Sequence, residues 1–167
     1  MSGILGADIV NQFDVLIDCP IGSIFFSTES MEYNGDDIAT DEFMGIPLIE
    51  ATIAGVSRRM FFDTGAQISY LQDESISGFP PMGSMTDFYP GFGQFETETF
   101  RVEFQIGKDT FSLRCGTLPD LLGMTLMMAD ADGIIGNEIL RNSVLTPAEI
   151  EYFTGSYRPV FDESSDS

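Results

Sequence analysis

The sequence predicts an all-β fold, and three observations predict it. Apolar and polar residues alternate along residues 99–115, as in a half-buried antiparallel hairpin. Turns that contain Gly or Pro separate the short apolar runs from residue 45 onward. One of these runs, Met60–Phe62, shows no alternation and leads directly into Asp63–Gly65. That pattern is typical of a strand buried on both faces that ends in a tight turn.

The N-terminal residues repeat a pattern that recurs near the C-terminal end. Gly-Ile-Leu-Gly at 3–6 matches Gly-Ile-Ile-Gly at 133–136, an offset of 130 residues. After three additional residues, the Gly-Ser pair at 22–23 matches the pair at 155–156, an offset of 133. This period is far longer than that of solenoid repeats. Each copy predicts a glycine-flanked strand, a short helix and then a strand pair around the Gly-Ser turn.

The middle of the chain predicts short strands between polar turns. Residues 28–44 are polar and acidic around Asn34-Gly35, which predicts a linker or an exposed hairpin. Strands are predicted in 46–54, 58–62 and 68–71. Residues 77–90, rich in Gly, Pro, Ser and Met, are predicted as a loop.

Three further segments complete the chain. Residues 87–95 place two glycines among four aromatic residues. Residues 118–128 are apolar and rich in methionine, which predicts a strand or part of a pocket wall, with core packing favoured over ligand binding. The polar residues 161–167 predict a disordered tail.

Composition limits the function. The chain has 167 residues, of which 43% are hydrophobic, enough for the core of one domain. Its 27 acids against 7 bases disfavour nucleic acid and anionic lipid as partners and favour basic ones, or simply indicate a solvated acidic surface. Histidine is absent, which excludes Ser-His-Asp triads, Cys-His pairs and histidine-ligated metals.

The expected compartment is the cytoplasm. No apolar run is long enough to span a membrane, and the first residues lack the basic start of a signal peptide. Cys19 and Cys115 lie far apart and outside any metal-ligand spacing. Both are therefore predicted to be free and buried thiols in a reducing compartment.

Two motifs carry the chemistry. In Phe61–Ser69 an apolar strand delivers one carboxylate, Asp63, into a tight turn, where backbone N–H groups and the Thr64 hydroxyl lie near its oxygens. We call residues 63–66 the acid turn. In Asp132–Leu140 a hydrophobic pair stands between two glycines and leads into a short predicted helix.

These motifs, in this order and with these flanking strands, resemble the signatures of the aspartic proteases, and Ala66 makes the acid turn more similar to the retropepsin branch than to the pepsin branch. The resemblance covers residues 45–160. It implies a closed acid-protease β-barrel with a glycine-rich flap hairpin and one short C-terminal helix. Residues 1–30 then resemble the tail of a preceding lobe, followed by an acidic linker at 31–44. Either the start of the chain is missing, or a short form retains this tail as a packing element.

The resemblance also implies an activity. Peptide hydrolysis by carboxylates needs two of them, close enough to share one proton and to hold one water. Because the chain offers one Asp-Thr-Gly, the second acid is expected to be Asp63 of another copy, in a homodimer that acts on a protein or peptide. No metal and no cofactor is implied.

The resemblance gives each site residue an expected role. Asp63, Thr64 and Gly65 are the catalytic residues: Thr64 would brace the two loops across the two-fold axis, and Gly65 would admit the substrate backbone. The substrate-binding residues are Ala66, Tyr89, Gly91, Gly93 and Ile135, with the aromatic segment as the flap. Ile134, Ile135 and Gly136 would pack beneath the acid turn. Asn137 stands where retroviral enzymes often have a basic residue, so an interface ion pair of that type is missing.

Several alternatives stay open. The aromatic segment is either a flap or an ordinary hairpin packed on the core. The N-terminal segment either adds strands to a dimer sheet or occupies the surface that a second subunit needs. The chain is either an endopeptidase or a catalytically inactive binding or scaffolding domain with the same fold. A metal site is a weaker third hypothesis, because no segment has the clustered Asp/Asn/Gly pattern of a calcium loop.

Overall fold

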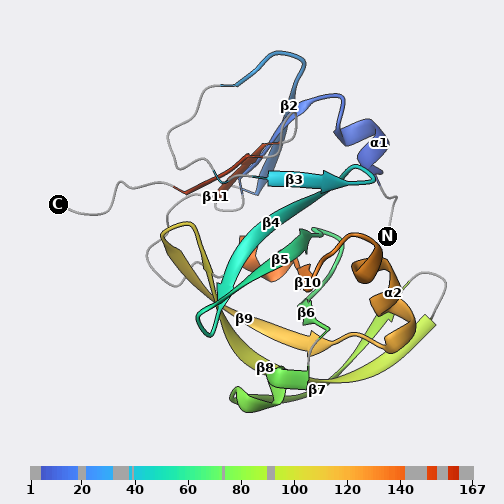
Figure 1. Ribbon diagram of the computed structural model, residues 1–167. Helices are drawn as coiled ribbons and strands as arrows, with labels where there is room; N and C mark the ends of the chain where they lie inside the picture. Colours follow the sequence, from blue (N-terminus) through green and yellow to red (C-terminus); the bar gives the residue numbers. More distant parts are fainter. Residues whose placement is uncertain are drawn as a thin grey trace.

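The computed structural model describes residues 5–18, 22–31, 38, 40–72, 74–89, 93–141, 150–153 and 158–161. In this part of the chain most strand residues belong to one sheet of eight strands, in the order β3-β4-β5-β10-β6-β9-β8-β7 (Figure 1). These strands are β3 (Thr40–Phe43), β4 (Ile46–Ile53), β5 (Val56–Phe62), β6 (Ser69–Leu71), β7 (Pro81–Tyr89), β8 (Gly93–Ile106), β9 (Asp109–Thr117) and β10 (Gly133–Ile135). The all-β prediction is therefore confirmed.

The second strand from one end of the sheet meets the second strand from the other end at one point. Thr52 of β4 lies opposite Gln105 of β8, although the two strands are not neighbours in the main strand order. This single pair is the only link of that kind in the described residues, so closure into a barrel stays a prediction.

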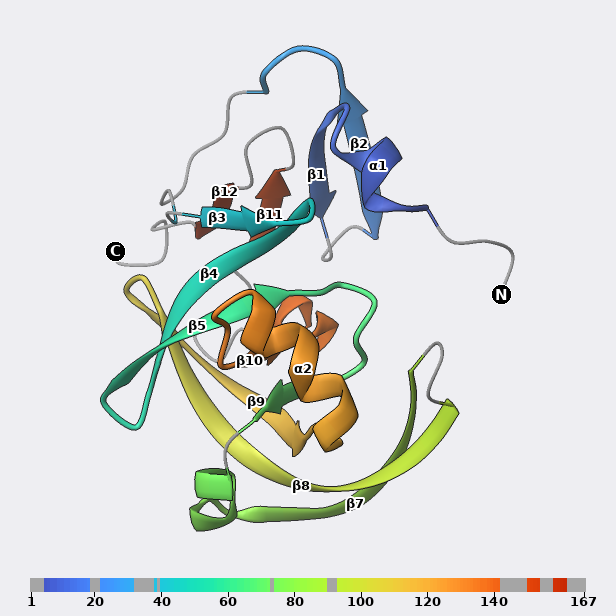
Figure 2. The ribbon, with the colours of Figure 1, turned by 45° about the vertical axis from the view of Figure 1, so that its right-hand side comes forward.

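Two small hairpins lie together at one end of the molecule (Figure 2). The first pairs β1 (Asp14–Asp18) with β2 (Ser23–Ser27), and the second pairs β11 (Ile150–Phe153) with β12 (Arg158–Phe161). Strands β1 and β11 are in contact. The tail of the chain from residue 162, like Asn34-Gly35 and Cys19, lies outside the described residues.

The structure agrees with the internal repeat. A helical turn precedes each hairpin: α1 (Ala7–Val10) before the first and the 3-10 turn η2 (Asn137–Leu140) before the second, at the same offset of 130 residues. The short helices and strand pairs predicted for the two copies are therefore confirmed. Residues 3 and 4 of the glycine-flanked strand predicted for the first copy lie outside the described residues, as does the second Gly-Ser pair.

The core follows the predicted alternation. Six inward-facing apolar side chains of β8 and β9 are at most 1% exposed: Val102, Phe104, Ile106, Phe111, Leu113 and Cys115. In β5, Met60 and Phe62 pack in one apolar cluster and Phe61 in another, which confirms burial on both faces. Burial of one such side chain contributes about 1.5–3 kcal/mol.

Two segments differ from the prediction. Most of residues 77–90, predicted as a loop, forms the 3-10 turn η1 (Glu74–Gly78) and strand β7, which pairs with β8. Residues 118–128, predicted as a strand or pocket wall, contain helix α2 (Asp120–Met128). Core packing of this segment holds for Leu126, which is 1% exposed, but is wrong for three methionines that are 61–76% exposed: Met124, Met127 and Met128.

Strand β3 lies inside the predicted acidic linker at 31–44 and pairs with β4. The domain boundaries otherwise stay a prediction. Within the described residues, no helix has both the length and the apolar content that crossing a membrane requires.

Candidate active site

The acid turn begins where β5 ends, and β10 fixes its position. β10 runs parallel to β5, with Ile135 opposite Phe62. The backbone N–H of Asp63 donates to the Ile135 carbonyl at 3.0 Å, so the pairing continues to Asp63 itself. Asp63 is therefore presented by a paired strand and not by a free loop.

The turn holds its own carboxylate. The Gly65 N–H donates to Asp63 Oδ1 at 2.8 Å, and the Ala66 N–H donates to the Asp63 carbonyl at 3.1 Å. A hydrogen bond from a backbone N–H to a carboxylate is stronger than one between neutral groups. Asp63 is half-buried, whereas Thr64 and Gly65 are exposed and Ala66 is half-buried. The predicted catalytic residues thus come together on an accessible turn.

The turn is also tied to η2. Asn137 donates its N–H to the Ala66 carbonyl at 2.8 Å and its side-chain amide to the Thr64 carbonyl at 3.2 Å. Gly136 donates its N–H to Ser69 Oγ at 3.2 Å. The residue that replaces the expected basic one therefore braces the acid turn without a charge.

The two glycines of the second motif are required by close packing. A Cβ on Gly133 would lie 2.2 Å from the Tyr70 carbonyl oxygen, and one on Gly136 would lie 2.3 Å from the Ile68 carbonyl oxygen. Neither backbone oxygen can move without disturbing the strand or turn to which it belongs. Gly-Ile-Ile-Gly therefore lets β10 and η2 lie directly under the acid turn.

Among the described residues, no hydrogen bond joins the Asp63 carboxylate to a second acid. The one hydrogen bond recorded for the Asp63 carboxylate comes from Gly65. Asp132 lies at the opposite end of β10, where its carboxylate accepts the Arg59 N–H at 2.9 Å and pairs with the Arg58 guanidinium at 3.3 Å. At about 3.3 Å per residue, four residues of strand separate the two acids by about 13 Å. Asp132 fixes the register of β5 and β10.

One predicted contact residue is buried. Ile135 is fully buried and packs with Phe62 in the core, so the prediction that it contacts substrate is corrected; it supports the acid turn from beneath, as also predicted. Its neighbour Ile134 is half-buried, lies opposite Tyr70 of β6 and packs against the second apolar cluster. Alternation along β10 places Ile134, rather than Ile135, toward the other face.

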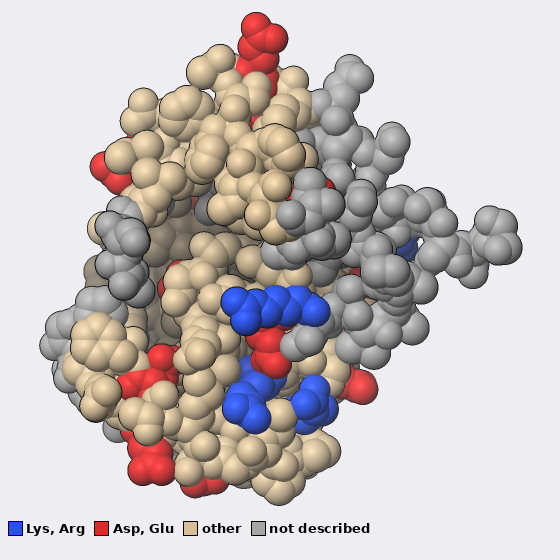
Figure 3. Space-filling model, turned by 180° about the vertical axis from the view of Figure 1, so that it is seen from behind, with Lys and Arg blue, Asp and Glu red and all other residues tan. Residues whose placement is uncertain are grey.

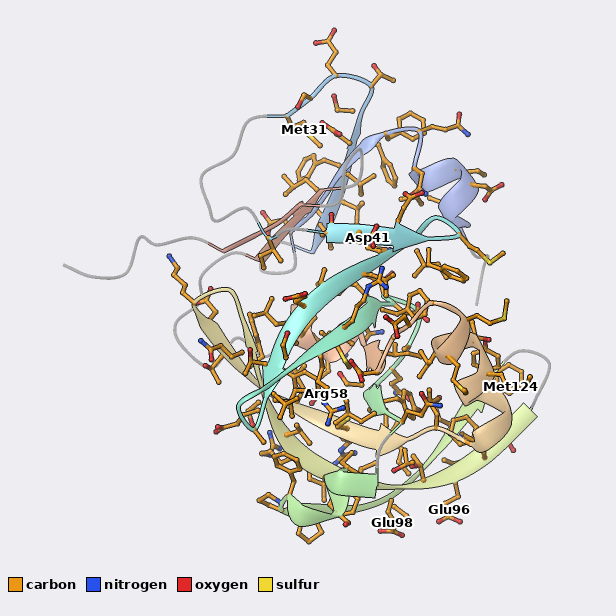
Figure 4. All side chains as sticks on the ribbon, viewed as in Figure 1. Met31, Asp41, Arg58, Glu96, Glu98 and Met124 are labelled. Carbon is orange, nitrogen blue, oxygen red and sulfur yellow. The ribbon has the colours of Figure 1, made fainter. Side chains whose placement is uncertain are left out.

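The predicted flap segment is the end of the hairpin formed by β7 and β8. Tyr89 pairs with Gly93, whose φ of 93° favours glycine, and both lie at the hairpin end as predicted. Gly91 lies outside the described residues. Figure 2 shows β7 and β8 curving together toward the side on which α2 lies. Glu96 and Glu98 are exposed and point away from the molecule (Figure 4), while Thr97 between them is buried.

Tyr70 joins this hairpin to the strand that follows the acid turn, a role that the sequence analysis missed. Its O–H donates to Asp87 Oδ2 on β7, and its ring lies 6.2 Å from that of Phe95 on β8. Burial, and then the hydrogen bond to Asp87, raise the pKa of the Tyr70 phenol. The only signal in the sequence is an aromatic residue just after the motif.

Other reactive groups of the described residues are few. No group of three or more Cys, Asp or Glu side chains there is arranged to hold a metal ion. Cys115 is a free, buried thiol, and burial raises its pKa. Its predicted state is therefore confirmed, whereas Cys19 lies outside the described residues.

Comparison with solved structures finds a likeness to the solution structure of the simian foamy virus (mac) protease, at 15% sequence identity and a TM-score of 0.41. The match covers 56% of this chain and 91% of that chain. No protein-family model and no curated protein sequence matches the chain.

Proposed function

We propose that the chain is a retropepsin-like aspartic endopeptidase that works as a homodimer, with Asp63 of each copy in one site. The observation that carries the proposal is the acid turn itself: a single carboxylate, held by Gly65 and braced by Asn137, on a surface that a second copy can reach. The described residues show no second acid bonded to Asp63, and a two-fold axis through the turn would supply it from the other copy.

The chemistry follows from the pair. Two carboxylates that share one proton titrate as a unit, so one is ionised and the other protonated at the same pH. The ionised Asp63 takes a proton from the bound water, which attacks the peptide carbonyl carbon, while the protonated Asp63 donates its proton to the carbonyl oxygen. The carboxyl that received the water proton then gives it to the peptide nitrogen as the C–N bond breaks, and the other carboxylate takes back a hydroxyl proton from the diol. Gly65 and Ala66 provide room for the substrate backbone, and the hairpin end at Tyr89 and Gly93 covers it.

The second candidate is a binding or scaffolding domain of the same fold without turnover. The observation that favours it is the incompleteness of the site in a single chain. The expected partners are a protein or peptide and a second copy of the chain, and the cytoplasm stays the proposed compartment.

The test combines assembly with activity. Sedimentation at micromolar concentration is compared with cleavage of a reduced, alkylated and therefore unfolded protein. We expect a dimer that cleaves this substrate and an Asp63→Asn variant that dimerises without cleaving. Asp130→Asn is the matched control, because it removes the same charge at an exposed position whose φ of 52° suits asparagine.

The outcomes separate the two candidates. A strict monomer that cleaves nothing contradicts the enzyme. A dimer that cleaves nothing at any pH between 3 and 8 supports the scaffold, and equal activity in wild type and Asp63→Asn removes Asp63 from the mechanism.

A further inference from the structure

A polar pocket of about 380 Å³ opens beside the acid turn. Gln67 and Ile68, which directly follow the turn, form one wall, and Met82 and Met85 of β7 form another. Its floor includes Asn137, the residue that braces the turn through the Thr64 and Ala66 carbonyls. Its volume lies within the range of about 300–1,000 Å³ found for ligand sites.

The pocket is basic on an acidic molecule. Arg114 of β9 and Arg141, which follows η2, both line it, so it holds two of the seven bases of the chain. We call it the arginine pocket. A third base lies next to it, since Arg101 of β8 is directly opposite Arg114 across the strand pair. Figure 3 shows basic side chains gathered in one area of a face that also carries acids.

Such a cluster has an electrostatic cost. Like charges directly opposite each other on neighbouring strands destabilise a sheet. Among the described residues, the recorded contacts of these guanidinium groups are neutral: Arg101 donates to Ser112 Oγ at 3.4 Å, and Arg114 donates to Met85 Sδ at 3.9 Å. A bound anion would relieve the repulsion.

The pocket also holds one acid, Glu138. Glu138 Oε2 accepts the backbone N–H of Arg114 at 2.6 Å, which holds that carboxylate against β9. No ion pair between the Arg114 guanidinium and a carboxylate is recorded in the described residues. A thioether is a weak acceptor, so the guanidinium of Arg114 can still donate hydrogen bonds to a carboxylate from outside.

We propose that the arginine pocket binds an acidic side chain, Asp or Glu, of the polypeptide whose backbone occupies the acid turn. The inference rests on the proposed function and names its substrate class. The wall of Gln67 and Ile68 continues the chain from the turn, so a polypeptide lying on the turn passes the pocket. Met82 and Met85 provide apolar contacts for the aliphatic part of the side chain, and Arg114 and Arg141 provide the charge. Because the molecule as a whole carries −20, this attraction is local to the pocket.

The experiment compares pairs of acetylated, amidated octapeptide pools. The two pools of a pair differ at one position only, where one pool has Glu and the other has Gln. Each pair tests a different position of the octapeptide. For wild type we expect kcat/KM to be about tenfold higher for the Glu pool at one position, the size of one charge-assisted hydrogen bond. Arg114→Gln is expected to bring this ratio to about 1, and Arg114→Lys to keep part of it.

Two further variants keep the test decisive. Arg141→Gln changes an exposed pocket residue and is expected to lower the ratio even where Arg114→Gln fails to fold. Lys108→Gln removes the same charge in the turn between β8 and β9, away from the pocket, and is expected to leave the ratio unchanged.

A binding measurement separates the failure of this inference from that of the proposed function. Fluorescein-labelled versions of the same pools are titrated with the Asp63→Asn variant, and anisotropy gives the ratio of Kd values for Glu and Gln. Equal Kd values at every position overturn the arginine pocket, even if Asp63-dependent cleavage occurs. A Glu preference that depends on Arg114, in a protein that cleaves nothing, overturns the endopeptidase and supports the pocket.

Discussion

Gly136 is the residue at which the fold leaves no room for a side chain. A Cβ there would lie 2.3 Å from the Ile68 carbonyl oxygen, 2.6 Å from its carbon and 2.9 Å from the Ala66 carbonyl oxygen. We expect Gly136→Ala to lower the free energy of unfolding by about 1–3 kcal/mol, because the backbone under the acid turn must shift. Urea unfolding measures the loss.

Gly78 is the matched control for this substitution. It ends η1, is exposed, and a Cβ there would meet nothing within 4 Å. Gly78→Ala is expected to be neutral or slightly stabilising, since alanine reduces the freedom of the unfolded chain. Equal losses at both positions would mean that the close approach at Gly136 is not the cause.

The buried thiol of Cys115 is expected to make the free energy of unfolding depend on pH. Burial raises its pKa in the folded chain above the value of about 8.5 expected when unfolded. Below about pH 8.5 the thiol is protonated in both states and has no effect. Above it the unfolded chain releases a proton that the folded chain keeps, so the free energy of unfolding falls as pH rises.

The expected loss is about 1 kcal/mol between pH 7.5 and 9.5. Urea unfolding at both pH values is compared for wild type and Cys115→Ala. The comparison concerns the change with pH, because alanine also leaves a cavity at both values. A variant that loses as much stability with pH as wild type would show that another group causes the fall.

At this scale the sequence predicted residues whose role depends on their immediate neighbours. Asp63 and Gly65 act within one turn, and their contact could be expected from the motif. Tyr70 could not be identified, because its partner Asp87 lies 17 residues away and reaches it only through strand pairing. The sequence predicts substrate contact for Ile135, because a three-residue strand is too short to show which of its side chains face inward.

The hairpin of β7 and β8 is the element whose position Tyr70 controls. The phenol O–H holds Asp87 of β7, and the ring packs on Phe95 of β8, so one side chain of β6 contacts both strands. We expect Tyr70→Phe to remove the hydrogen bond, at a cost of about 1–2 kcal/mol, and to keep the ring contact. Hydrogen exchange in residues 81–89 and 93–100 is expected to become faster.

Tyr89→Phe is the control, because Tyr89 is 39% exposed at the hairpin end. This variant also removes a tyrosine hydroxyl group, but it leaves the hydrogen bond from Tyr70 to Asp87 in place. Faster exchange that is confined to the hairpin in Tyr70→Phe supports the contact. Faster exchange throughout the sheet would instead indicate general destabilisation.

Elements were predicted well where the core determines them and poorly elsewhere. β8 and β9 show their alternation because every second side chain is buried. β7 has no buried position in its pattern and forms because β8 offers it a partner, so its composition resembles a loop. Helix α2 exposes three of its methionines, and its short apolar sequence shows no helical period.

At the scale of the whole molecule, a helical turn followed by a hairpin occurs twice, once on each side of the main sheet in the sequence. The copy at β1 and β2 lies against β11, so the two related hairpins contact each other within one chain. The acid turn, in contrast, stays accessible, with Thr64 and Gly65 exposed. Among the described residues, the N-terminal copy therefore packs on its C-terminal counterpart, while Thr64 and Gly65 are exposed.

Assembly of two such copies must overcome their charge. Each chain carries a net charge of −20, so two copies repel each other unless salt screens them. We expect the dimer Kd to fall by about tenfold when sodium chloride is raised from 50 mM to 1 M, since the Debye length shrinks from about 14 Å to about 3 Å. Sedimentation equilibrium at the two salt concentrations measures the change.

The activity of the proposed dimer must depend on salt concentration in the same way as dimerisation does. Below the dimer Kd, cleavage per chain rises with protein concentration, because only pairs of Asp63 carboxylates react. Raising the salt concentration is then expected to lower the protein concentration at which this rise occurs. The factor should equal the fall in the dimer Kd that sedimentation measures. Cleavage per chain that is constant from nanomolar to micromolar protein, while sedimentation shows the dimer dissociating over that range, would assign the activity to a single chain. A dimer that weakens with salt would instead indicate that opposite charges, such as the arginines near the acid turn, meet acids across the interface.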